Sequence, residues 1–150
     1  MATKAGETVI IASGREPNVL PRLLDGELLG TAFIAEGKSF SSLKRWIGYS
    51  AQPKGTLVLD DGACTAIVQE GRSLLPIGIA DVKGAFAKGD VVQLCDRSGN
   101  EAARGLTNYD AEQVSKIKGL RTTQIAEILG QCPYAEVIHR DNMAVTNKET

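Results

Sequence analysis

The stretch Asp60–Asp90 constrains the fold most, because it joins one short helical segment to strands that bend at glycines. Asp61 is expected to cap the helix, since a short carboxylate accepts the free backbone N–H groups of a first turn. Gly78, Gly84 and Gly89 then recur at short intervals, which is typical of a sheet that bends sharply or closes on itself. This order of elements predicts a small, closed, barrel-like sheet rather than a layered α/β domain.

Residues 8–12, with the sequence TVIIA, are expected to form a strand that is buried on both faces, as in a parallel α/β sheet. A short helix is predicted over Val19–Leu24, and a second strand over residues 30–34. Because this strand–helix–strand unit cannot bury both faces of a sheet by itself, we expect it to be the end of a larger α/β domain. Its apolar side chains should then be covered by that missing domain or by another copy of the chain.

The remaining chain alternates short strands with short helices. Residues 37–54 are expected to be a linker with one helical turn, in which Trp46 is the apolar anchor. Asp110 is expected to cap one later helix, and Thr122 or Thr123 another. The other predicted strands cover residues 56–59, 91–95, 101–107 and 136–145, and a polar tail follows at 147–150.

The composition argues against several classes of protein. The formal net charge of −1 argues against a chain devoted to coating nucleic acid. The cysteines Cys64, Cys95 and Cys132 form no CxxC pair, so reduced thiols in a cytoplasmic protein are expected rather than a zinc or redox motif. No apolar run approaches the roughly 20 residues of a membrane span, so no membrane partner is expected.

A series of short motifs carries a resemblance to a known family. The motifs lie, in this order, at Gly55 to Ala63, Gly71 to Pro76, Gly84 to Phe86, Ala103 to Leu106 and Val137 to Asn142. Together they resemble the C-terminal PUA domain of the glutamate 5-kinase family, and Lys44 to Ile47 extends the resemblance toward the N-terminus. The series is specific, although any one motif alone would be a weak signal.

This resemblance implies an α+β, mainly β fold. A PUA-like pseudo-barrel is expected at residues 55–146, after the linker at 37–54. Residues 1–36 would be the strand–helix–strand remnant of an α/β amino-acid-kinase domain. The resemblance also implies a homo-oligomeric parent enzyme.

The family enzyme transfers the γ-phosphoryl group of ATP to the side-chain carboxylate of glutamate, which is the first step of proline biosynthesis. Magnesium accompanies the nucleotide, and such transfer depends on positioning and charge neutralisation. The family's glutamate-binding residues and glycine-rich nucleotide loops lie upstream of the motifs matched here. No catalytic, cofactor-binding or metal-binding residue is therefore assigned in this chain, and we expect the chain alone not to phosphorylate glutamate; ATP and magnesium belong to the parent enzyme.

An RNA-binding role is the alternative function. Arg72, Lys83, Lys88 and Arg104 flank the helix and glycine bends that other PUA domains use to hold RNA, which is an analogy at the level of the fold. Phosphate binding would need these four side chains to converge on one face. The chain from residue 36 onward has equal numbers of basic and acidic side chains, which favours a solvated, mixed-charge surface instead.

Two further positions have simple structural explanations. Ser13, Gly14 and Arg15 follow a predicted strand, where α/β proteins place ligand loops, but they lack the glycine series of a phosphate loop. His139 is the only histidine, and no second histidine or cysteine lies near it in the sequence. It is expected to have a structural role rather than to bind a metal or transfer protons.

Overall fold

The computed structural model describes residues 8–34 and 42–146. The chain divides into two compact units, Met1–Ser41 and Ser42–Thr150, and each unit is described by itself. The polar tail expected at 147–150 and the first residues of the expected linker lie outside the described residues.

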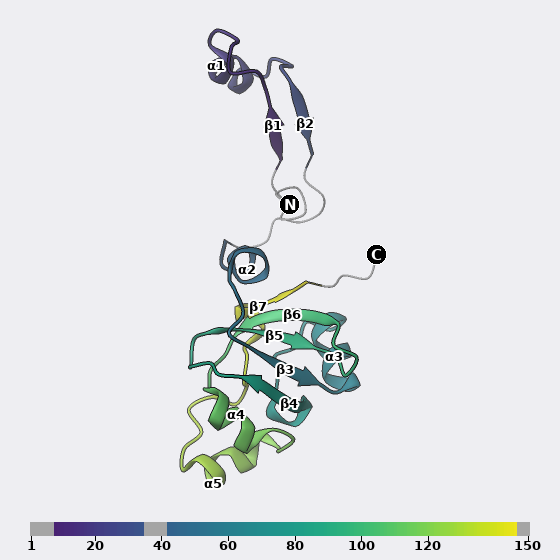
Figure 1. Ribbon diagram of the computed structural model, residues 1–150, viewed down its shortest axis with the longest axis vertical. Helices are drawn as coiled ribbons and strands as arrows, with labels where there is room; N and C mark the ends of the chain where they lie inside the picture. Colours follow the sequence, from purple (N-terminus) through teal and green to yellow (C-terminus); the bar gives the residue numbers. More distant parts are fainter. Residues whose placement is uncertain (1–7, 35–41, 147–150) are drawn as a thin grey trace. The chain divides into compact units, whose positions relative to one another are not determined.

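The first unit contains the expected strand–helix–strand order, β1 (Val9–Ile11), α1 (Val19–Leu24) and β2 (Thr31–Phe33). The two strands form an antiparallel pair, with α1 in the connection between them (Figure 1). Within residues 8–34 the first strand pairs in an antiparallel and not a parallel arrangement, and it is not buried, because Ile11 is 61% exposed and α1 buries none of its residues. Two strands and one short helix form too little surface to bury an apolar face.

The second unit is built on a five-stranded sheet with the strand order β4-β3-β5-β6-β7. Only β3 and β5 are parallel, and every other neighbouring pair is antiparallel. The strands are β3 (Gly55–Leu59), β4 (Ile79–Gly84), β5 (Val91–Cys95), β6 (Glu101–Leu106) and β7 (Met143–Val145). The mainly β, α+β class is confirmed, but in the described part of the chain β4 and β7 form the two ends of an open sheet and do not pair to close it.

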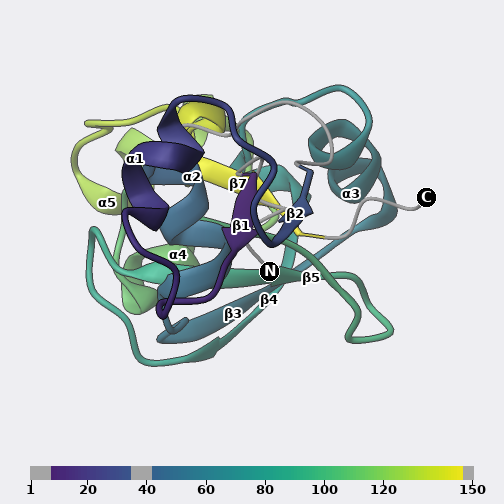
Figure 2. The same cartoon turned by 90° about the horizontal axis from the view of Figure 1, so that it is seen from above.

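Short helices surround this sheet. Figures 1 and 2 show α4 and α5 next to each other, away from α3. In chain order the helices are α2 (Ser42–Arg45), the π-helix η2 (Trp46–Ser50), α3 (Asp61–Val68), η3 (Pro76–Gly78), α4 (Ala111–Ile117), η4 (Thr122–Gln124), α5 (Ile125–Leu129) and η5 (Arg140–Asn142). None of the helices within residues 8–34 and 42–146 has the length and apolar character needed to cross a membrane.

The pleat of the sheet separates an apolar core face from a polar outer face. Leu57 of β3 lies beside Leu94 of β5, which lies beside Ala103 of β6. All three side chains are fully buried and belong to one core cluster. Because successive residues of a strand point to opposite faces, Thr56 and its neighbours lie on the outer face.

Helix capping follows the sequence in one helix and differs by one residue in another. Asp110 caps α4 as expected, with its Oδ1 accepting the Gln113 N–H at 2.8 Å. The cap of α3 is Asp60 and not Asp61, since Asp60 Oδ1 accepts the Ala63 N–H at 2.7 Å. Asp60 follows β3 and has an extended backbone, which is the conformation of an N-cap residue, whereas Asp61 is already helical.

Three smaller expectations are also corrected. Trp46 is 48% exposed, and the buried anchor of this segment is the next residue, Ile47, which packs with Val91. No threonine caps α5, because the 3-10 helix η4 precedes it. The expected final strand pair reduces to β7 and an isolated bridge between Leu74 and Ile138.

Candidate functional site

A row of polar side chains crosses the outer face of the sheet. Thr56 of β3 lies between Lys83 of β4 and Gln93 of β5, and Gln93 lies beside Arg104 of β6. A hollow of about 400 Å³ opens over this row, and Lys54 lies at its edge. We call this hollow the outer-face pocket; its lining combines three cationic side chains with a hydroxyl and an amide.

Glu101 holds the guanidinium at one side of the outer-face pocket. Its Oε1 accepts from Arg104 Nε at 2.8 Å and its Oε2 from Gln93 Nε2 at 2.6 Å. Burial alone would raise the pKa of Glu101, but the hydrogen bond and charge of Arg104, together with hydrogen bonding from Thr146 and, least, from Gln93, leave that pKa below its ordinary value. The carboxylate is therefore ionised at neutral pH and orients Arg104.

A β-bulge makes this ion pair possible. Residues three apart in a regular strand point to opposite faces. The pairing of β5 with β6 shifts between Leu94 and Cys95, so that Cys95 lies beside Glu101 and Leu94 beside Ala103. The extra residue at the bulge places Glu101 on the same face as Arg104.

A second, larger hollow of about 700 Å³ lies along α3 and is called the α3 groove. Its apolar lining comes from α3 and from the segment after it, including Leu74 and Leu75. Arg72, His139 and Arg140 supply cationic or titratable groups at its rim, and Asp60 and Glu136 supply carboxylates. The charges of this groove are therefore mixed.

His139 has a structural contact within the rim of the α3 groove. Its Nδ1 accepts the backbone N–H of Asp141 at 3.2 Å and so caps η5. Its Nε2 lies 4.0 Å from Glu136 Oε1. These contacts agree with the structural role expected from the sequence.

The four cationic residues proposed from the sequence do not lie at one site. Lys83 and Arg104 line the outer-face pocket. Arg72 instead lines the α3 groove, with its Nε 3.4 Å from Glu70 Oε2. Lys88 sits over the ring of Tyr134, with its Nζ 4.5 Å from the ring centroid. The structure thus brings only two of the four together.

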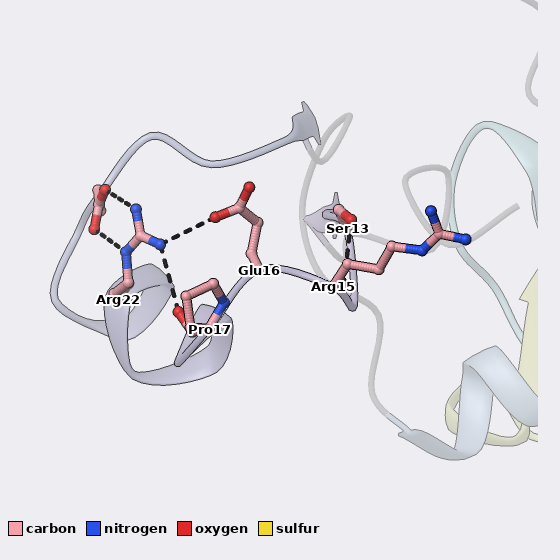
Figure 3. Close-up of polar contacts among 6 residues, drawn as sticks. Ser13, Arg15, Glu16, Pro17 and Arg22 are labelled. Atoms are coloured by element: carbon pink, nitrogen blue, oxygen red, sulfur yellow. Dashed lines mark hydrogen bonds and ion pairs between the residues drawn. The ribbon is translucent and has the colours of Figure 1, made fainter.

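The polar groups of the first unit stabilise its own loop (Figure 3). Arg22 donates to Glu27 Oε2 at 2.6 Å and to Glu16 Oε2 at 3.3 Å, and these contacts raise its pKa and lower that of Glu27. Ser13 Oγ accepts the backbone N–H of Arg15 at 3.3 Å. The Ser13–Arg15 segment is therefore held as a loop at the end of β1 by contacts within the chain, as expected for a structural loop rather than a phosphate loop.

Metal-binding and thiol chemistry have little structural basis in residues 8–34 and 42–146. Within these ranges no three His, Cys, Asp or Glu side chains are grouped to hold a metal ion. The three cysteines are free; Cys95 is buried, Cys64 is half-buried and Cys132 is exposed. Burial raises the pKa of both Cys64 and Cys95, so neither thiol is activated as a nucleophile.

Comparison with known proteins gives matches along nearly the whole chain. Residues 55–129 match the PUA domain family. A glutamate 5-kinase of Synechococcus sp. (strain JA-2-3B'a(2-13)) is 48% identical over 98% of the chain and 40% of the relative. A glutamate 5-kinase of Desulfotalea psychrophila (strain LSv54 / DSM 12343) is 48% identical over 93% of the chain and 37% of the relative.

The solved structures similar to this chain include a PUA domain from Aeropyrum pernix K1, with 20% sequence identity and a TM-score of 0.47, which covers 63% of this chain and 45% of that chain. The chain spans about two fifths of the length of the curated relatives it matches. The matched part of those relatives is their C-terminal part.

Proposed function

The chain belongs to the PUA domain family and is the counterpart of the PUA-containing C-terminal part of glutamate 5-kinases, and we propose that it serves as a non-catalytic module of such an enzyme. The parent enzyme would phosphorylate the side-chain carboxylate of glutamate with ATP and magnesium. The observation that carries the proposal is the 48% identity over 98% of the chain, which includes both units. A cytoplasmic location is part of the same proposal, since the parent reaction consumes ATP.

The exposed apolar side chains of the first unit support the proposal that this unit packs against a larger domain. Ile11 and Leu24 are 61% and 88% exposed, and none of the residues from 8 to 34 is buried. Exposed apolar side chains on neighbouring elements are typical of an interaction surface. We infer that the preceding domain of the parent enzyme covers this surface, so that the PUA-containing unit supports assembly, regulation or placement of the catalytic domain.

The catalytic part of the proposal is tested by comparing the chain with a chimera. The isolated chain is expected to show no glutamate-dependent ATP turnover with magnesium present, because phosphoryl transfer needs a nucleotide site that we place in the preceding domain. A chimera in which this chain replaces the matched part of the Synechococcus enzyme is expected to retain activity. The same enzyme truncated before the matched part is the control, and glutamate-dependent turnover by the isolated chain would refute the proposal.

The exposed surface of the first unit is expected to cause self-association when the preceding domain is absent. Sedimentation velocity over a range of concentrations should show association of the full chain. The double substitution Ile11→Lys, Leu24→Lys should reduce it, because charged side chains are costly to bury at an apolar contact. The substitution Leu75→Lys, at a 42% exposed position of the second unit, is the control. A strictly monomeric wild-type chain would contradict the expectation.

The RNA-binding role is the second candidate. The observation in its favour is that Lys83 and Arg104 line one pocket. Arg72 lines the α3 groove and Lys88 lies over the ring of Tyr134, so that a continuous phosphate-binding surface from all four residues has no support in the geometry. An RNA competitor in a phosphate titration of the outer-face pocket tests this role.

A further inference from the structure

The outer-face pocket has an unusual balance of charge. Its lining contains three cationic side chains, from Lys54, Lys83 and Arg104, and no carboxylate. The three residues come from the turn before β3, from β4 and from β6, so they are far apart in sequence and the strand register brings them together. Thr56 and Gln93 add polar groups between them.

Neither lysine of this pocket forms an ion pair with a carboxylate of the described residues. In the described ranges, no carboxylate oxygen lies within 4 Å of Lys54 Nζ or Lys83 Nζ. Asp81 shares the outer face with Lys83, two residues earlier on β4, but its Oδ1 accepts from Lys118 Nζ at 3.0 Å. Arg104 is paired with Glu101, so the pocket as a whole keeps an excess of positive charge.

Two glycines let the backbones of β3 and β4 approach closely at one end of the pocket. Gly55 and Gly84 are paired across β3 and β4. A Cβ on Gly84 would lie 3.0 Å from the Gly55 Cα, and the φ of +87° at Gly84 also disfavours any side chain there. A Cβ on Gly55 would meet the ring of Phe86 on the core side of the sheet and would lie 2.7 Å from the carbonyl oxygen of Lys83. The backbones of β3 and β4 are therefore close together at the residues next to Lys54 and Lys83.

We propose that the outer-face pocket binds a phosphate group, either as free phosphate or carried by a small phosphorylated molecule. Two lysines without an ion-pair partner, beside an oriented guanidinium and neutral polar groups, form an environment that favours a compact anion. The volume of about 400 Å³ lies within the range of small-ligand sites. No aromatic side chain lines the pocket, so it lacks the stacking platform that single-stranded RNA uses. This site is independent of the proposed parent reaction.

The test is a titration of the full, ¹⁵N-labelled chain with inorganic phosphate, pyrophosphate and O-phosphoserine at constant ionic strength. We expect saturable shifts of the amide signals of Gly55, Thr56 and Gly84. Lys54→Gln and Lys83→Gln should each weaken binding roughly tenfold, because each removes one charge-assisted hydrogen bond. Both lysines are exposed, so the variants should fold normally.

The matched control is Lys116→Gln, which removes the same charge from α4, where Lys116 pairs with Glu112. Binding of this variant should equal that of the wild type. Equal weakening by Lys116→Gln and Lys83→Gln would show a response to net charge only and would overturn the proposal, as would the absence of saturable shifts.

Displacement of pyrophosphate by a structured RNA at lower concentration would assign the pocket to RNA instead. Tighter binding of O-phosphoserine than of inorganic phosphate would identify a carried phosphate group as the ligand, and the reverse order would identify the free anion.

Discussion

The substitution Leu94→Ala is expected to destabilise the second unit by about 2 to 5 kcal/mol, which is the range for leucine truncation in a close-packed core. Leu94 is fully buried on the middle strand β5, between Leu57 and Ala103. Truncation removes apolar contacts and leaves a cavity that strands fixed on both sides cannot fill. Because the free energy of unfolding of a small domain is only about 5 to 15 kcal/mol, this loss is a large part of the total stability. Urea denaturation followed by circular dichroism measures it.

The matched control for this prediction is Leu75→Ala. Leu75 is 42% exposed beside the α3 groove, so the same truncation should cost about 1 kcal/mol or less. Similar losses for the two variants would mean that the face of the sheet carrying Leu57 and Leu94 is not the core of the unit. The polar row that includes Thr56 and Gln93 could then not be assigned to the outer face either, because that assignment depends on Leu57 and Leu94 facing the core.

The elements that the sequence predicts well are those determined by neighbouring residues. The capping box that begins α4 needs only Asp110 and Gln113, and the glycine that ends α5, Gly130, has the positive φ expected after a helix. The open sheet could not be predicted in the same way. The parallel pairing of β3 with β5 joins strands with α3 and β4 between them in the sequence, and no local pattern specifies such a pairing.

The outer-face pocket likewise combines residues that the sequence indicates with an arrangement that only the strand pairing determines. Lys83 and Arg104 can be selected from the sequence as cationic residues, but their proximity depends on the register through Thr56 and Gln93. Glu101 could not be assigned as the partner of Arg104, because regular alternation along β6 would place it on the core face. Lys54, in the turn before β3, carried no sequence signal other than its charge.

The substitution Gly105→Val is expected to destabilise the second unit by about 3 kcal/mol, at the upper end of the usual cost of overpacking. Valine is a good strand residue, so at an exposed strand position it would be favourable. Gly105 is buried in β6, and a Cβ there would lie 2.6 Å from Ile138 Cγ2 and 3.2 Å from the Asn142 carbonyl oxygen. Ile138 cannot move aside easily, because it is fully buried, β-branched and held by the bridge to Leu74.

A double-mutant cycle separates this clash from a general loss of packing. Gly105→Ala introduces the Cβ alone, and Ile138→Ala removes the Cγ2 methyl that it would contact. If close approach is the cause, the double variant should be more stable than the sum of the two single effects predicts, by an interaction free energy within the roughly 0.5 to 3 kcal/mol seen for residues in contact. Strict additivity in urea denaturation would instead mean that β6 and the Ile138 segment do not approach as closely as described.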